Sequence, residues 1–202
     1  MTLKKMWEYM IADCLASLNI PPHGHKALVL LKRFCTNGLF RFVVIYRLIY
    51  YISTKKSIFF VPFCIICKAI YHIESHKNGI QLPCKQLIEK GLRFMHYSGI
   101  VISAESIGEN CTIFQGVTIG HSFLGKNPGR PRIGNRVVIF AGAKVVGNIS
   151  IGDDVIIGAN AVVNRSIPSG CVVVGNPAKI INQDSRRYMT DEIRPHLLGV
   201  LN

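Results

Sequence analysis

Two of the seven histidines lie where an imidazole could take part in chemistry. His96 and His121 fall within the patterned part of the chain, and imidazole is the side chain that most readily exchanges a proton near neutral pH. The other five lie outside it, where surface or packing roles are the default: His23, His25, His72, His76 and His196. Cys64-Ile65-Ile66-Cys67 has redox-motif spacing, but its apolar setting favours buried thiols. No set of metal ligands is evident, so we expect no metal site.

A six-residue period runs through the second half of the chain. Ile or Val recurs at positions 133, 139, 145, 151, 157 and 163, and Ile at 107, 113 and 119. This period fits neither a helix nor a strand alternation, so the chain must turn a corner once per repeat. Ordinary hairpins are the alternative, but they need two-residue turns such as Asn-Gly, which are missing at this interval. The period therefore predicts a parallel β-solenoid whose coils bury their inward aliphatic residues.

The phase of the repeat predicts three regions. Leu82, Ile88, Phe94 and Ile100 are also six apart but one residue out of phase with Ile107, so we expect the solenoid to occupy residues 79–181. Residues 107 and 133 are 26 apart, two more than four repeats, which predicts a loop extruded at 121–132. Residues 1–78 lack the period and are expected to form helices, with breaks at Asn37-Gly38 and at residues 53–56. Residues 182–202 are expected to form a helical tail.

Four segments of the predicted solenoid resemble a known family. They are 96–102 (HYSGIVI), 115–120 (QGVTIG), 141–147 (AGAKVVG) and 172–179 (VVVGNPAK). Together they are similar to the left-handed β-helix of the hexapeptide-repeat acyltransferases, in the branch that contains serine acetyltransferase and polysaccharide O-acetyltransferases. The expected fold is thus mainly β, a left-handed parallel β-helix with an N-terminal helical region and one extruded loop.

The resemblance implies direct transfer of an acetyl group from acetyl-CoA to a hydroxyl group, with His96 as the general base. A hydroxyl is a poor nucleophile at neutral pH, and a neutral imidazole can take its proton as it attacks the thioester carbonyl. Serine acetyltransferases have an acidic residue, which orients this base, where the chain has Gln81. The amide oxygen of Gln81 could accept an N–H but cannot stabilise an imidazolium by charge. His96 and Gln81 are therefore the candidate catalytic residues, with His121 as the alternative base.

Two further departures from the family concern the acceptor. The acid that precedes the base in serine acetyltransferase is Met95 here, and the histidine of its Arg-His-Pro segment corresponds to Arg130. Because both would meet a small charged amino acid, their loss favours a bacterial surface saccharide as the acceptor. Serine remains the alternative, a small antibiotic molecule is a more distant one, and a non-catalytic assembly platform is a further one. The expected substrate contacts are Tyr97, His121, Phe123 and Arg130.

The family also implies where coenzyme A binds. Acetyl-CoA would be a co-substrate, with no permanently bound cofactor, in a groove between two subunits of a homotrimer or of a dimer of trimers. Small residues would let it approach the backbone, basic residues would bind its phosphates, and the turn near Gly120 would supply oxyanion donors. For the alanines, corner packing inside the solenoid is a compatible alternative. The candidates are Gly120, Ala141, Gly142, Ala143, Lys144, Ala159, Ala161, Arg165 and Lys179.

The net charge of +13 is unevenly distributed, since residues 1–78 hold eleven Lys and Arg against three acids. No nucleic-acid-binding motif is visible, so we expect no nucleic acid partner. The apolar residues of one segment are expected to pack between helices or subunits, and the lysines beside them leave peripheral contact with a membrane surface as the alternative: Lys55, Lys56, Phe59, Phe60, Phe63, Ile65, Ile66 and Lys68. Arg41, Arg47 and Pro62 interrupt the apolar stretches, so no spanning helix is expected. The cysteine usage and the missing signal-peptide pattern predict a cytoplasmic location, with the inner membrane face as an option.

Overall fold

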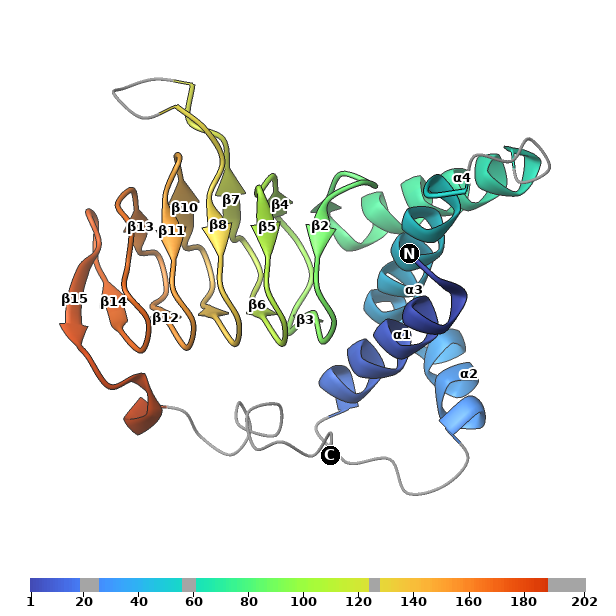
Figure 1. The fold of residues 1–202 in the computed structure, drawn as a ribbon, viewed down its shortest axis with the longest axis horizontal. Helices are drawn as coiled ribbons and strands as arrows, with labels where there is room; N and C mark the ends of the chain where they lie inside the picture. The colour runs from blue at the N-terminus through green and yellow to red at the C-terminus, as the bar shows by residue number, and fades with distance from the viewer. Residues whose placement is uncertain (19–25, 56–60, 124–127, 189–202) are drawn as a thin grey trace.

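Helices form the first part of the chain and lie together at one end of an elongated molecule (Figure 1). The computed structural model describes residues 1–18, 26–55, 61–123 and 128–188. In these ranges the helices are α1 (Leu3–Leu18), α2 (Lys26–Thr36), α3 (Gly38–Ser53) and α4 (Val61–Asn78). The predicted break at Asn37-Gly38 is the start of α3, where the Asn37 side chain accepts a hydrogen bond from the backbone N–H of Phe40 at 2.8 Å.

Short strands build the rest of the molecule as a prism with three sheets as its sides. The first sheet holds β1 (Ile80–Gln81), β4 (Ile100–Ile102), β7 (Thr118–Gly120), β10 (Lys144–Val146) and β13 (Val162–Val163). The second holds β2 (Leu87–Ile88), β5 (Ser106–Ile107), β8 (Arg132–Ile133) and β11 (Ser150–Ile151). The third holds β3 (Arg93–Phe94), β6 (Thr112–Ile113), β9 (Val138–Ile139), β12 (Ile156–Ile157), β14 (Val172–Val174) and β15 (Lys179–Asn182).

The strand order confirms the predicted solenoid. The chain visits the three sheets in turn, and neighbouring strands are parallel, as in the pairing of β4 with β7 and of β7 with β10. Among the strands in the described ranges, β15 alone runs antiparallel to its neighbour, β14. The residues of the six-residue period point inward, and Ile113, Ile139 and Ile157 are completely buried. The period thus arises because each coil stacks its aliphatic side chains on those of the next.

Two corners of the prism require glycine. Gly91 and Gly142 have φ angles of +80° and +74°, a region that residues with a side chain rarely adopt. A Cβ atom at Gly91 would lie 2.1 Å from Oδ1 of Asn110, and one at Gly142 would lie 2.1 Å from Oδ1 of Asn160. Backbone of one coil therefore approaches the corner asparagine of the next too closely for any larger residue.

The helices cap the open end of the first coil with side-chain hydrogen bonds. Tyr46 of α3 donates to the carbonyl of Gln86, and Tyr71 of α4 donates to the carbonyl of Leu82. Arg47 donates to the carbonyls of Ile88 and Glu89 at 2.6 and 2.7 Å. These carbonyls belong to the first coil, which has no preceding coil to pair with.

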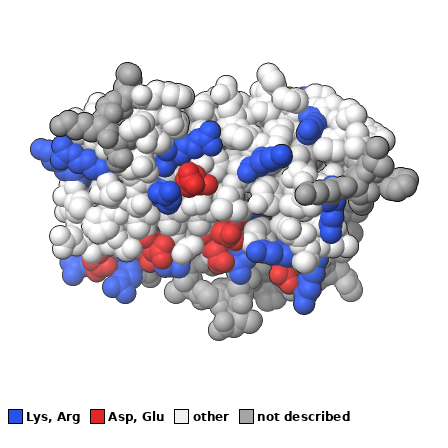
Figure 2. Space-filling model, turned by 45° about the horizontal axis from the view of Figure 1, so that its top comes forward, with Lys and Arg blue, Asp and Glu red and all other residues white. Residues whose placement is uncertain are grey.

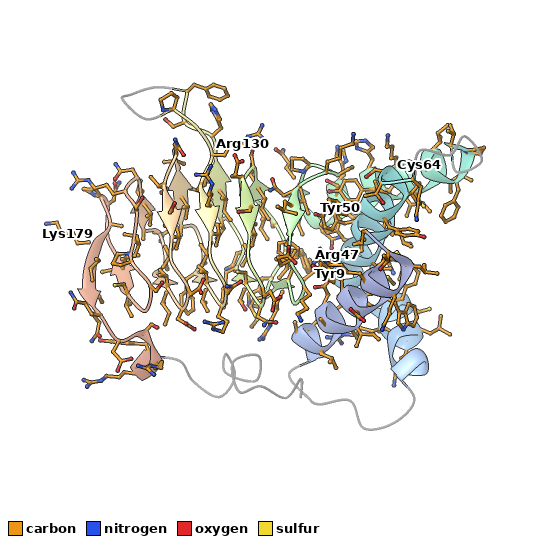
Figure 3. The ribbon with its side chains drawn as sticks, in the orientation of Figure 1. Tyr9, Arg47, Tyr50, Cys64, Arg130 and Lys179 are labelled. Atoms are coloured by element: carbon orange, nitrogen blue, oxygen red, sulfur yellow. The ribbon has the colours of Figure 1, made fainter. Side chains whose placement is uncertain are left out.

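A buried ion pair adds α1 to this cap. Asp13 accepts hydrogen bonds from Nε and Nη2 of Arg47 at 2.9 and 3.3 Å and from the backbone N–H groups of Gly91 and Leu92 at 2.8 and 2.9 Å. Burial by itself lowers the pKa of Arg47, but the carboxylate of Asp13 outweighs it and the pKa lies above its usual value. Tyr9 also reaches this junction and donates to the carboxylate of Glu89. Figure 3 shows Tyr9 and Arg47 together where the helices meet the first coil.

One hydrophobic core runs through the helices and the solenoid. Phe42, Ile49 and Tyr71 belong to the same buried cluster as Ile80 and the inward residues of all later coils. Helices α3 and α4 are thus packed directly onto the first coil of the solenoid. Among the described helices, none is long and apolar enough to cross a membrane.

The ends of the predicted segments can be compared with the structure in part. The extruded loop leaves after Gly120, the last residue of β7, and returns at Arg132, the first residue of β8. In the predicted tail, a 3₁₀ helix covers Ser185–Tyr188, and residues 189–202 lie outside the described residues. Cys67 is buried on α4 and Cys64 is partly buried, both as free thiols, in line with the expectation of structural cysteines.

Candidate functional site

The prism has three edges, and two of them carry the residues that the sequence singled out. At the edge where the third sheet passes into the first, here named the His96 edge, His96 follows β3 and precedes β4. At the edge where the first sheet passes into the second, here named the loop edge, the extruded loop joins β7 to β8. Figure 1 shows this loop projecting from the prism. The first sheet therefore separates His96 from the loop within one chain.

The turn that carries His96 is fixed on both sides. Ser98 has a φ of +93° and donates its backbone N–H to the carbonyl of Asn78, the last residue of α4, at 2.8 Å. The carbonyl of Ser98 accepts from the N–H of Gly116 in the next coil at 2.9 Å. This turn leaves His96 and Tyr97 exposed. A backbone held at both ends thus presents an imidazole to solvent.

Aromatic rings continue along the His96 edge. The ring of His96 lies 6.2 Å from that of Phe114, centroid to centroid, and Phe114 stacks on Phe140 at 4.8 Å. These three residues occupy the same corner of successive coils. The imidazole therefore stands at the end of an apolar ladder that runs along the solenoid.

Several predicted coenzyme A contacts share this edge. Ala141 and Gly142 lie between β9 and β10, and Ala159 lies between β12 and β13, at the corners of later coils. Ala159 is exposed, and Ala141 and Gly142 are partly exposed. The structure thus brings small residues onto the same edge as His96, as a binding track for a long thin molecule would require.

The other predicted coenzyme A contacts are placed differently. Ala143 and Ala161 are completely buried, so their side chains fill the core, as in the packing alternative. The Nζ atom of Lys144 donates to the carbonyl of Gly116 at 2.6 Å and to the hydroxyl of Thr118 at 3.1 Å. Arg165 is exposed at the corner after β13, on the loop edge. Lys179 is exposed on β15, at the end of the prism far from the helices (Figure 3).

Gly120 is a special case among the predicted contacts. It ends β7 at the root of the loop, and its carbonyl accepts from the N–H of Gly147 at 3.2 Å. A Cβ atom there would make only ordinary contacts, 3.6 Å from Cγ2 of Thr118 and 3.8 Å from Cγ1 of Val146. The coil itself therefore does not require glycine at this position.

Gln81 lies on the outer face of β1 and is exposed. Neither a hydrogen bond nor an ion pair joins it to His96 in the described part of the chain. It lines instead a cavity of about 760 Å³ between α4 and the first sheet, together with His72, Ser75 and His76. Gln81 thus does not orient the imidazole of His96 in this structure.

His72 and His76 are the residues near the candidate site that the sequence did not single out. Nδ1 of His76 lies 2.8 Å from the carbonyl oxygen of His72, which can only accept, so Nδ1 is the donor in this contact. The two histidines are four residues apart, so they share one face of α4. Because α4 ends two residues before β1, this spacing could have indicated that they face the same cavity as Gln81.

The residues at the root of the loop form a second group. The rings of His121 and Phe123 lie 4.2 Å apart, and Phe123 is 83% exposed. Ser122 and Gly129 exchange backbone hydrogen bonds of 3.0 and 3.1 Å, which places His121 opposite Arg130 on the two arms of the loop. Nδ1 of His121 is buried and has no hydrogen-bond partner among the residues that the structure describes. Three of the four predicted substrate contacts thus gather on the loop edge, away from His96.

Comparison with known proteins places this arrangement among acyltransferases. Residues 130–165 match the family model described as bacterial transferase hexapeptide (six repeats). The serine acetyltransferase of Helicobacter pylori (strain ATCC 700392 / 26695) is 40% identical over 140 residues, which cover 69% of this chain and 78% of that protein. The serine acetyltransferase of Staphylococcus aureus (strain Mu50 / ATCC 700699) is 44% identical over 124 residues, covering 61% of this chain and 58% of that protein.

Solved structures agree with the sequence relatives. The serine acetyltransferase of Neisseria gonorrhoeae in complex with serine superposes with a TM-score of 0.69 at 26% identity, covering 89% of this chain and 70% of that chain. A serine acetyltransferase in complex with CoA superposes with a TM-score of 0.67 at 26% identity, covering 89% and 71%. These matches confirm the predicted left-handed β-helix and acetyl-CoA as co-substrate.

The same comparisons correct the predicted acceptor. The sequence departures at Gln81, Met95 and Arg130 led to a bacterial surface saccharide as the acceptor, and that prediction is wrong, because the similar proteins are serine acetyltransferases. The departures concern a few side chains, whereas the alignment extends over 140 residues at 40% identity. The platform alternative is also set aside, since these relatives are enzymes.

Proposed function

Because the chain belongs to the hexapeptide-repeat acyltransferase family and is an acetyl-CoA-dependent enzyme, we propose that its acceptor is the hydroxyl group of L-serine. One observation carries this proposal: the Helicobacter pylori serine acetyltransferase shares 40% identity over 78% of its length. The structure of a serine acetyltransferase with serine bound, which shares the fold over 89% of this chain, supports it further.

In the proposed reaction, His96 acts as the general base. Its neutral imidazole takes the proton of the serine hydroxyl while the oxygen attacks the thioester carbonyl of acetyl-CoA. The C–O bond forms, the tetrahedral intermediate collapses, the C–S bond breaks, and the thiolate of coenzyme A takes the proton. The products are O-acetylserine and free coenzyme A.

The placement of His96 suits this role. Its ring is exposed, its backbone is held by Asn78 and Gly116, and no hydrogen bond or ion pair engages the ring in the described part of the chain. Ala141 and Gly142 are small, partly exposed residues on the same edge.

A homotrimer would complete the site. His96 and the loop that carries His121 and Arg130 lie on different edges of one prism. Three prisms packed side by side can bring the loop edge of one chain against the His96 edge of the next. We therefore propose that the enzyme is a homotrimer and that the loop residues contact serine bound at a neighbouring chain's His96.

Thiol release from acetyl-CoA tests the function. The purified protein, with L-serine and a panel of bacterial oligosaccharides offered separately, is expected to release thiol with L-serine. His96→Ala should lower the rate by roughly 10²- to 10⁴-fold, the usual contribution of a general base. Lys32→Ala, on the exposed surface of α2, is the control and should keep the wild-type rate.

The two parts of the proposal fail separately. Absence of thiol release with L-serine, in a protein that binds acetyl-CoA, would refute serine as the acceptor. A wild-type rate in His96→Ala would refute the assignment of the base and leave serine in place.

A further inference from the structure

A small cavity, here named the Arg33 pocket, lies where α1, α2 and the start of α3 meet β3. Its volume is about 190 Å³, less than the roughly 300 Å³ at which pockets for drug-sized ligands begin. Asp13 and Ser17 line it from α1, Arg33 from α2 and Arg93 from β3. Neither the proposed acetyl transfer nor the predicted coenzyme A contacts involve these residues. The pocket is therefore a candidate site for a small ligand of its own.

The guanidinium group of Arg33 is only partly bonded. Its Nη2 donates to the carbonyl of Ser17 at 2.9 Å, whereas its Nε is buried and has no hydrogen-bond partner among the described residues. No ion pair joins Arg33 to a carboxylate in that part of the chain. A buried donor on a charged group lowers stability when it has no acceptor. An acceptor bound in the pocket would therefore stabilise this side chain.

Asn37 adds a second donor to the pocket. Its side-chain oxygen accepts a hydrogen bond from the backbone N–H of Phe40 at 2.8 Å and so caps α3. The remaining NH2 group of the amide can only donate, and no hydrogen bond engages it within the described ranges. Asn37 lines the pocket together with Arg33. Donors from α2 and from the residue before α3 thus surround the same space.

The charge of the pocket is positive. Asp13 is the one acid among its described lining residues, and the carboxylate of Asp13 is already paired with Arg47 and accepts four hydrogen bonds. Arg33 and Arg93 contribute two guanidinium groups to the lining, and Arg93 is only 5% exposed. Positive charge in a concave, partly desolvated site favours an anion as the ligand.

From these observations we propose that the Arg33 pocket binds one small tetrahedral oxyanion of the phosphate or sulfate class. Guanidinium groups pair with such anions through parallel N–H···O bonds. The donors and the positive charges come from three separate elements, and the four oxygens of a tetrahedral anion can face all of them, whereas a carboxylate has two oxygens. The bound anion would join α1, α2 and α3 to the first coil of the solenoid.

General attraction to a basic surface is the alternative. The chain carries a net charge of +13, and Figure 2 shows Lys and Arg side chains spread over the face turned to the viewer. Some of this charge belongs to the segment 55–68 that the sequence marked for packing or membrane contact, of which Lys56, Phe59 and Phe60 lie outside the described residues. Anions gather near such a surface without occupying one site. A specific site is instead saturable and depends on Arg33 more than on a neighbouring cation.

Isothermal titration calorimetry of the full-length protein at constant ionic strength tests the proposal, with inorganic phosphate, inorganic sulfate and acetate as probes. We expect saturable binding of phosphate and sulfate at one anion per chain, and weaker binding of acetate. Arg33→Ala should raise the Kd roughly 10- to 100-fold, because it removes hydrogen bonds to a charged group. Lys32→Ala is the matched control, since it removes the same charge from an exposed position on α2 and should keep the wild-type Kd.

Asn37→Asp tests the pocket independently of the Arg33 variant. Aspartate can still accept from the N–H of Phe40 and keeps the cap of α3, but it replaces the amide donor with a negative charge. Binding of phosphate and sulfate should be lost in this variant. Urea denaturation without added anion shows whether each variant is folded.

Four results would overturn the proposal. The first is the absence of saturable binding of phosphate and sulfate at millimolar concentrations. The second is an equal rise of the Kd in Lys32→Ala and Arg33→Ala, which would assign the binding to net charge. The third is undiminished binding in folded Asn37→Asp. The fourth is tighter binding of acetate than of either tetrahedral anion, which would assign the pocket to a carboxylate group.

Discussion

Replacing Asp13 with Asn should destabilise the protein far more than the same replacement at a partly exposed aspartate that also pairs with an arginine. The carboxylate of Asp13 is 1% exposed and accepts four hydrogen bonds, two of them from Arg47, which is also 1% exposed. Asn keeps the size of the side chain but removes the charge and one accepting oxygen. The guanidinium of Arg47 then stays buried without a counter-charge, which typically costs about 3 to 5 kcal/mol of the free energy of unfolding.

The pair between Arg136 and Asp154 provides the control within the same molecule. It is bidentate, with both N–O distances 2.7 Å, but its side chains are about one third exposed. Solvent screens such a pair, so Asp154→Asn should cost no more than about 1 kcal/mol. Urea denaturation of both variants at one protein concentration gives the two free energies directly, and fixing the concentration removes the effect of subunit association.

The double variant Asp13→Asn with Arg47→Met makes the test sharper. If the uncompensated charge causes the loss, removing the guanidinium should restore part of the stability. The reasoning is refuted if Asp13→Asn costs no more than Asp154→Asn. It is equally refuted if the double variant is no more stable than Asp13→Asn alone.

The remaining predictions concern pH and backbone geometry. Burial raises the pKa of Cys111 from 9.0 to about 12. Between these pH values the thiol ionises in the unfolded protein but not in the folded one. The free energy of unfolding should therefore fall with rising pH, by up to about 1.4 kcal/mol for each pH unit. Urea titrations from pH 8 to about 10.5 should show a shallower fall in Cys111→Ala than in the wild type, and parallel curves would contradict this. Gly91→Ala should cost about 2 kcal/mol or more, since it adds a clash with Asn110 to the positive φ. Gly170→Ala, with φ +75° and its nearest contact at 3.7 Å, should cost only about 1 kcal/mol, and equal losses would contradict the role of the clash.

The repeat made the solenoid predictable because each coil obeys the same local rule. Ile113, Ile139 and Ile157 are inward in the structure as their period requires, and the break in phase between Ile119 and Ile133 lies where the chain passes from β7 to β8. Such a pattern is repeated in the sequence, so it can be recognised without knowing any contact between distant residues.

The buried junction was not predictable in the same way. Arg47 was read only as an interruption of an apolar stretch, whereas the structure pairs it with Asp13, which lies 34 residues earlier. The contacts of Asp13 with Gly91 and Leu92 bridge 78 and 79 residues. Nothing in a local pattern of charge or hydrophobicity marks two residues as partners over such a separation.

The candidate site was predictable by residue and less so by arrangement. His96 and the small residues at Ala141 and Gly142 lie on one edge, but the loop residues His121 and Arg130 lie on another. The edge on which a residue lies depends on how many corners the chain turns before it reaches that residue. Corners beyond the extruded loop can be counted only when the position of the loop is known. The acceptor was wrong because single departures from the family were weighed above its overall similarity.

The caps on the first coil have a consequence for aggregation. A stack of parallel strands ends in a row of unpaired backbone groups, and such an edge can recruit a strand from another molecule. Here Tyr46, Arg47 and Tyr71 donate to carbonyls of that row, while Asp13 accepts from two of its N–H groups. At the other end, the antiparallel β15 closes the third sheet. Unfolding of the helices would therefore expose these backbone groups and allow end-to-end association of solenoids into fibres. In this way the helical region would prevent the protein from polymerising.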